Sequence, residues 1–234
     1  MAIYFNSKSF KNGFQGLSNL MGGVEFDYMC ARFPQQVMKD LFVRLRNCDR
    51  ETFLEWLQIL QPDKKWTPKK LAYWFTPYGE PIRGILAQLL GSMVRRKAGK
   101  LTQVSKRRQK VVCEKLGLAS IEVVPELSDK NKKAFMKECL RKKYSMEPYH
   151  SLLLSSAVDL HEKPLRGNGN NWTYKKTDGV IYGKDWLGEL LMEVRADLAV
   201  LSDESSLKRS ADVSDGVVSC TKKARVSFKQ YVVK

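Results

Sequence analysis

The sequence has little of what metal sites and disulfide frameworks require. It contains two histidines, His150 and His161, and an odd number of cysteines (five) without any C-x-x-C pair. Zinc sites need several such ligands at short characteristic spacings, and disulfide scaffolds need paired cysteines. The sequence therefore predicts no metal and no cofactor, and its cysteines indicate a reducing compartment.

Long apolar runs are also missing. The most apolar stretch, ILAQLLGSMV at 85–94, is too short and too polar to cross a bilayer. The first residues, MAIYFNSKSF, lack the basic start and apolar run of a signal peptide. We therefore expect an intracellular protein with no membrane partner.

Acidic residues are scarce relative to basic ones, and the formal net charge is +16. Residues 62–115 alone carry 14 Lys and Arg against three acids, interleaved with Trp66, Tyr73, Trp74 and Tyr78. Proteins that bind single-stranded nucleic acids combine basic and aromatic side chains in this way. Nucleic acid is therefore a candidate partner of residues 62–115, and a solvated basic surface is the alternative.

Apolar periodicity predicts one mainly helical α+β domain over residues 1–201, with brief β character at 3–5, 121–124 and 180–182. The predicted helices are 24–33, 35–46, 50–60, 68–75, 81–97, 104–116, 129–143, 149–157 and 185–201. The periodicity ends after Leu201, and the Ser-, Asp- and Lys-rich segment 202–234 is predicted to be a disordered basic tail.

Two basic clusters in this tail resemble a bipartite nuclear-import signal. They consist of Lys208 and Arg209, and of Lys222, Lys223 and Arg225. Because basic pairs are common in solvated tails, the motif is a weak one. It predicts entry into the nucleus of a eukaryotic, or virus-infected eukaryotic, cell.

The segment GKDWLGELLMEVRADL at 183–198 has leucines at helical spacing, and Asp185 is placed to cap the helix. Gly188 lies inside the first turn, where glycine weakens a helix by about 1 kcal/mol relative to alanine. One interpretation is an anion site at the free amides, with Lys184 adding its charge. Close packing of the helix on a neighbour is an equally good one, and Trp186 is expected in the core.

This segment and two earlier ones together resemble the NADAR (YbiA-like) family. The first is GFQGLSNLMGGVEFDYMCARF at 13–33, which corresponds to the family's early "LSNF" and "VEH" block. The second is the middle block KAFMKECLRKKYSMEPYHSLLLSSAVDLHEK at 133–163, and the closing GKDWLGELLMEVR is the closest match. The resemblance implies a NADAR-like single domain that hydrolyses an N-glycosidic bond of a ribosylamino-pyrimidine or of ADP-ribosylated guanine.

The resemblance also implies roles for individual residues. Breaking an N-glycosidic bond builds positive charge on the ribose, so a carboxylate can stabilise the transition state and activate water. Glu25 is the candidate, with Tyr28 and Arg32 on the same helical face; a surface salt bridge is the alternative. Glu162 matches a family glutamate that can orient a ribose hydroxyl, or else caps a turn. Asn19, in the early block, and Trp172, in the loop RGNGNNWTY, complete the predicted nucleotide-sugar site.

The chain also departs from the family pattern. Phe26 replaces the usual histidine, a tryptophan expected near Leu127 is absent, and asparagines surround Trp172 where an acid is expected. The chain is longer than the family between Phe33 and Leu116, which indicates a basic insertion at about 34–115. These departures favour a second hypothesis, a catalytically degenerate scaffold that binds nucleic acid or ADP-ribose without turnover.

Overall fold

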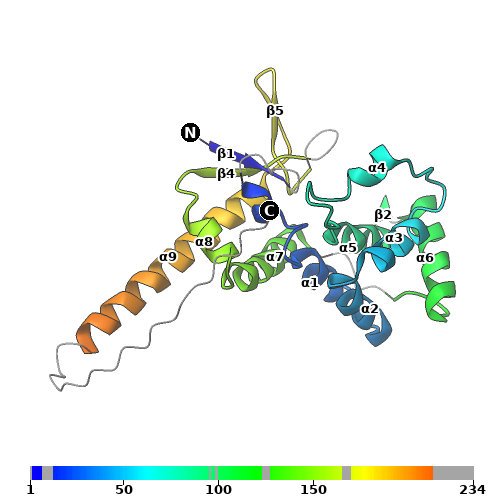
Figure 1. Cartoon of the computed structure of the whole chain (residues 1–234), viewed down its shortest axis with the longest axis horizontal. Helices are drawn as coiled ribbons and strands as arrows, with labels where there is room; N and C mark the ends of the chain where they lie inside the picture. The colour runs from blue at the N-terminus through cyan, green and yellow to red at the C-terminus, as the bar shows by residue number, and fades with distance from the viewer. Residues whose placement is uncertain are drawn as a thin grey trace, which may run out of the picture. The chain divides into compact units, whose positions relative to one another are not determined.

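The computed structural model describes residues 2–6, 13–94, 96–97, 100–122, 127–164 and 170–212. It divides into two compact units, Met1–Leu198 and Ala199–Lys234. Within the described ranges the protein is mainly helical, as predicted, and its strands are short (Figure 1). None of the helices in these ranges is both long and apolar enough to cross a membrane.

The helices follow the predicted order along the chain. They are α1 (Val24–Cys30), α2 (Gln36–Arg46), α3 (Arg50–Ile59), α4 (Pro68–Ala72), α5 (Gly84–Gly91), α6 (Gln103–Leu116), α7 (Asp129–Tyr144), α8 (Tyr149–Leu154) and α9 (Trp186–Asp212). The described ranges also contain two short 3-10 helices, η2 (Phe14–Leu17) and η3 (Ser92–Val94).

The strands form three two-stranded pairs within the described residues. β1 (Ala2–Phe5) pairs in parallel with β4 (Asp159–Glu162), and Phe5 lies opposite Glu162. β2 (Arg96–Lys97) and β3 (Lys100–Leu101) are antiparallel, as are β5 (Lys175–Thr177) and β6 (Val180–Tyr182). The parallel pair joins two segments that are far apart in the sequence.

Several boundaries differ from those predicted. The predicted helix 81–97 is interrupted, because α5 ends at Gly91 and η3 and β2 follow. Ile121 and Glu122 are not in a strand, and the rest of that predicted strand lies outside the described residues. Helix α9 continues to Asp212, beyond the predicted start of the tail at 202, and 213–234 lie outside the described residues.

Two hydrophobic cores lie within Met1–Leu198, and α1 contributes to both. The first core uses residues between Phe26 and Val112, from α1 to α6. The second core joins the beginning of the chain to its later part, and packs Phe5 and Leu17 with residues of α7, β4 and α9. Because Phe26 faces the first core and Val24 and Tyr28 face the second, α1 lies between them.

Candidate functional site

Glu25 lies in the first turn of α1 and is buried. Gly22 and Gly23 precede the helix with φ of 74° and 85°, so the chain turns sharply from the preceding loop into α1. Burial raises the pKa of Glu25 from 4.5 to about 8, and a hydrogen bond with the Asn19 side chain opposes this rise. Glu25 therefore holds its proton at neutral pH.

Glu162, the last residue of β4, is also buried. Burial raises its pKa to about 8. The Ser18 hydroxyl, which donates to Oε1 at 2.8 Å, opposes the rise; the charge of Glu25 adds to it, and the charge of Lys143 opposes it. Because the two carboxyl groups are close enough to interact, ionising one disfavours ionising the other, and the pair titrates in two steps.

Lys143 on α7 completes this cluster. Its Nζ donates to the carbonyl oxygen of Gly16 and, at 3.0 Å, to that of Ser18. Burial lowers the pKa of Lys143 to about 7, and the charge of Glu162 opposes this fall. Burial therefore disfavours the charged form of all three groups. We call Ser18, Asn19, Glu25, Lys143 and Glu162 the buried network.

Two cavities lie beside the buried network. Each has a volume of about 420 Å³, and they share Gly22 and Arg46 in their walls. Arg83 and Tyr149 line the first cavity, and Lys143 lines the second. The Lys143 ammonium lies 4.7 Å from the centre of the Tyr149 ring, so these two side chains link the cavities to the network. Two arginines in the first wall, and one arginine with two lysines in the second, suit a ligand that carries phosphate.

The loop that separates Glu25 from the first cavity requires glycine. A Cβ on Gly23 would lie 2.5 Å from Nε of Arg46, and one on Gly22 would lie 2.9 Å from Cζ of Tyr149. Both glycines line the first cavity. Neither Glu25 nor Glu162 is among the described residues that line the two cavities. The two acids are therefore not exposed in either wall.

Three of the predicted site residues, Tyr28, Arg32 and Trp172, interact through Tyr28. Trp172 packs edge-on against Tyr28, with ring centroids 6.0 Å apart, and against Trp186 at 5.2 Å. Burial raises the pKa of Tyr28 to about 12, and the positive charge of Arg32 opposes the rise. Nε of Arg32 is buried and has no hydrogen-bond partner among the described residues. Tyr28 therefore interacts with Trp172, Arg32 and Glu25, all four of which were predicted to belong to the site.

Lys184 and Gly188 do not join this group. The Lys184 ammonium lies 3.7 Å from Asp129 and 5.3 Å from the centre of the Trp186 ring. A Cβ on Gly188 would lie 2.1 Å from the carbonyl oxygen of Leu160, so this glycine lets α9 pack against the backbone of β4. Close packing, the second interpretation of Gly188, accounts for it.

The sequence analysis missed two features of this region. Lys143 follows Met136 and Leu140 at helical spacing on the buried face of α7, and a lysine at an apolar position was the available signal. Nδ1 of His161 lies 2.5 Å from Oδ2 of Asp185, whose backbone has φ 53°. This pair lies 24 residues apart in sequence, so spacing gave no signal for it.

Other predicted features fall outside the site. No group of His, Cys, Asp and Glu in the described part of the chain is arranged to hold a metal. Of the predicted import signal, the second cluster lies outside the described residues, and the first lies in α9 where side chains are not described. Comparison of the chain with protein-family models, with curated proteins and with solved structures found no match.

Proposed function

We propose that the protein is an N-glycosidase that hydrolyses the bond between ribose and a base in a ribosylated or ADP-ribosylated nucleotide. The observation that carries the proposal is the buried network, whose two carboxyl groups have pKa values of about 8 and whose Lys143 lines a cavity together with Arg46. Shifted pKa values beside a cavity are typical of acid–base catalysis. The resemblance to the NADAR family supports the same chemistry.

In this proposal Glu25 acts first as an acid. Its proton passes to the leaving nitrogen of the base as the bond from that nitrogen to the ribose carbon breaks. The resulting carboxylate stabilises the positive ribose and then accepts a proton from the attacking water, which restores Glu25. This changes the role expected from the sequence, which began with an ionised Glu25, because burial keeps the group protonated at neutral pH.

Access to Glu25 requires movement of the loop in front of it. Gly22 and Gly23 can supply the backbone change that opens the first cavity toward the acids, while Arg46 and Arg83 hold the phosphate of the substrate. Arg32, with its buried Nε, is a further candidate for contact with substrate.

The test is release of the free base from ADP-ribosylated guanine nucleotide and, separately, from the ribosylamino-pyrimidine, followed by chromatography. Glu25→Gln keeps the size of the side chain and removes the proton transfer, so the rate should fall by about a hundred- to ten-thousand-fold. Glu51→Gln, at an exposed position on α3, is the matched control and should retain activity. Full activity in Glu25→Gln would exclude this carboxyl group and leave Glu162 as the acid.

The second candidate is a scaffold that binds nucleic acid or ADP-ribose without turnover. Phe26, which lines the first cavity where the family usually has histidine, favours this alternative. Saturable binding by a wild type that hydrolyses neither substrate would select it.

A further inference from the structure

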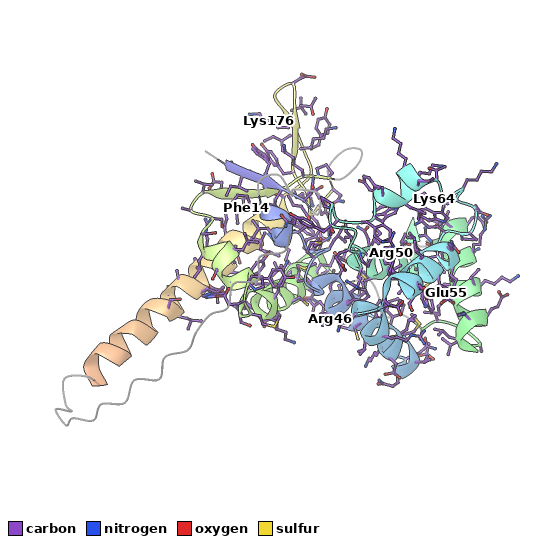
Figure 2. All side chains as sticks on the ribbon, in the orientation of Figure 1. Phe14, Arg46, Arg50, Glu55, Lys64 and Lys176 are labelled. Carbon is purple, nitrogen blue, oxygen red and sulfur yellow. The ribbon has the colours of Figure 1, made fainter. Side chains whose placement is uncertain are left out.

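A third cavity, of about 250 Å³, lies between residues 60–64 and 104–108, and none of its lining residues belongs to the buried network. Most of them belong to residues 62–115, which we call the basic segment. The cavity is formed where the chain leaves α3 and where α6 passes beside it, and Figure 2 labels Lys64 at this place. Its walls combine apolar and basic side chains, principally Leu60, Gln61, Lys64, Val104, Arg107 and Arg108.

The charge of this cavity is positive. Its wall contains three basic side chains, those of Lys64, Arg107 and Arg108, and one acidic side chain, that of Asp63. Asp63 forms an ion pair with Arg107. Arg108 is held in place, because its Nε donates to the carbonyl oxygen of Leu60 at 2.6 Å. A fixed guanidinium costs a ligand little ordering when it binds.

The amide of Gln61 in the cavity wall, and the indole of Trp66 outside that wall, carry donors without a partner among the described residues. Nζ of Lys64 donates to Oε1 of Gln61 at 3.0 Å, which fixes the orientation of that amide. Nε2 of Gln61 is buried without an acceptor among the described residues, and so is Nε1 of Trp66, whose ring lies 4.6 Å from the Lys64 ammonium. Buried donors normally have acceptors, so this combination calls for an anionic ligand rich in oxygen.

The remaining wall is apolar. Leu60, Pro62 and Val104 contribute to it, and Val104 is 55% exposed. A ligand that fits both parts of the wall has a phosphate beside a flat apolar group. A nucleotide has this composition.

The cavity lies on a surface that can follow a longer phosphate chain. Exposed lysines lie on the same stretches of chain as the cavity residues, just before α4, on α4 and at the start of α6: Lys65, Lys69, Lys70 and Lys106. Trp74 adds a second ring, 5.6 Å from the Lys64 ammonium. Basic and aromatic side chains along one surface suit single-stranded nucleic acid.

We propose that this cavity binds one nucleotide of a single-stranded nucleic acid, with the phosphate at Arg107, Arg108 and Gln61 and the base against Leu60 and Val104. The proposal rests on the second candidate function, nucleic-acid binding by the basic segment. Only the binding part of that candidate is needed, so the proposal holds whether or not Glu25 is catalytic.

The test compares two basic residues of α6 that both form ion pairs, one in the cavity wall and one outside it. Arg107 pairs with Asp63 inside the cavity wall, whereas Lys110 pairs with Glu114 at 3.9 Å outside it. Binding of a fluorescent oligothymidine to the full chain is followed by anisotropy at several salt concentrations. Arg107→Gln should weaken binding about three- to tenfold and reduce the slope of log affinity against log salt by about 0.7, the value for one phosphate of a single strand. Lys110→Gln, the matched control, should do neither.

Neutralising the acidic partners of these two ion pairs should have the opposite effect on binding. Asp63→Asn removes the competitor for Arg107 and should strengthen binding, and Glu114→Gln is its control. Competition by thymidine monophosphate but not by thymidine would show that a free nucleotide occupies the same cavity. Competition by neither, with the Arg107 effect intact, would show that the cavity binds a nucleotide only as part of an oligonucleotide.

Three outcomes would overturn the proposal. Equal effects of Arg107→Gln and Lys110→Gln would mean that only overall charge attracts the strand. Strong binding unaffected by Arg107→Gln and Asp63→Asn would place the strand elsewhere on the basic segment, and would leave the second candidate function standing. Absence of binding at low salt would exclude both.

Discussion

Burial of Glu25 should make Glu25→Gln more stable than the wild type, and increasingly so as pH rises. The pKa of Glu25 is about 8 in the folded protein, against 4.5 as its ordinary value. Because the folded pKa is raised, the stability associated with this group is fully present below pH 4.5 and is lost as pH rises toward 8. The glutamine variant has no proton to lose and escapes this loss.

The size of the effect follows from the pKa shift. Between the two pKa values, each pH unit removes about 1.4 kcal/mol from the free energy of unfolding of the wild type relative to the variant. From about pH 5 to about pH 7.5 the difference should therefore grow by about 3 kcal/mol in favour of Glu25→Gln. The substitution that we propose removes catalysis would thus stabilise the fold, which is typical of residues retained for function.

The measurement is urea unfolding, followed by tryptophan fluorescence, at a series of pH values across this range. Glu51→Gln, at an exposed site, serves as the control and should follow the wild type at each pH. A difference between Glu25→Gln and the wild type that stays constant with pH would refute the argument. It would mean that Glu25 ionises in the folded protein without a cost of desolvation.

Three further predictions concern packing, the buried network and the tail. Gly188→Ala should lower the free energy of unfolding by about 1–3 kcal/mol despite the better helix propensity of alanine, because the new methyl group meets the carbonyl oxygen of Leu160; equal stability in urea would contradict this. Lys143→Met leaves the carbonyl oxygens of Gly16 and Ser18 without their donor and should cost about 1–3 kcal/mol in the same assay, whereas an unchanged midpoint would show that the contacts contribute nothing. Alanine at both basic clusters of the tail, the 208–209 pair and 222–225, should abolish nuclear accumulation of a fluorescent fusion, and persistent accumulation would exclude the import signal.

The helical part of the fold could be predicted because its signals are local. Apolar spacing within each segment located all the helices from α1 to α9, including α7, which begins at Asp129 as predicted. β4 escaped prediction because its residues, DLHE, have no β character of their own. They form a strand because β1 pairs with them, and that partner lies far away in the sequence.

The site was predictable only in part, because its properties also depend on residues that are far apart in the sequence. The family resemblance directed attention to Glu25 and Glu162, and the structure places them in one network. The raised pKa values were not predictable, because desolvation depends on burial by residues from distant segments. Lys143 was overlooked because a lysine in a basic helix such as α7 ordinarily faces solvent.

The distribution of the two cores along the chain has a consequence for how the protein folds during synthesis. The first core is made of residues between Phe26 and Val112, so it can pack as soon as α6 has left the ribosome. The second core forms only when Phe5 can pack against the start of α9. The buried network likewise forms only when Ser18 can bond with Lys143 and Glu162. The acids of the candidate active site therefore become buried only after most of the chain has been translated, and a nascent chain arrested before β4 would hold Glu25 exposed and ionised.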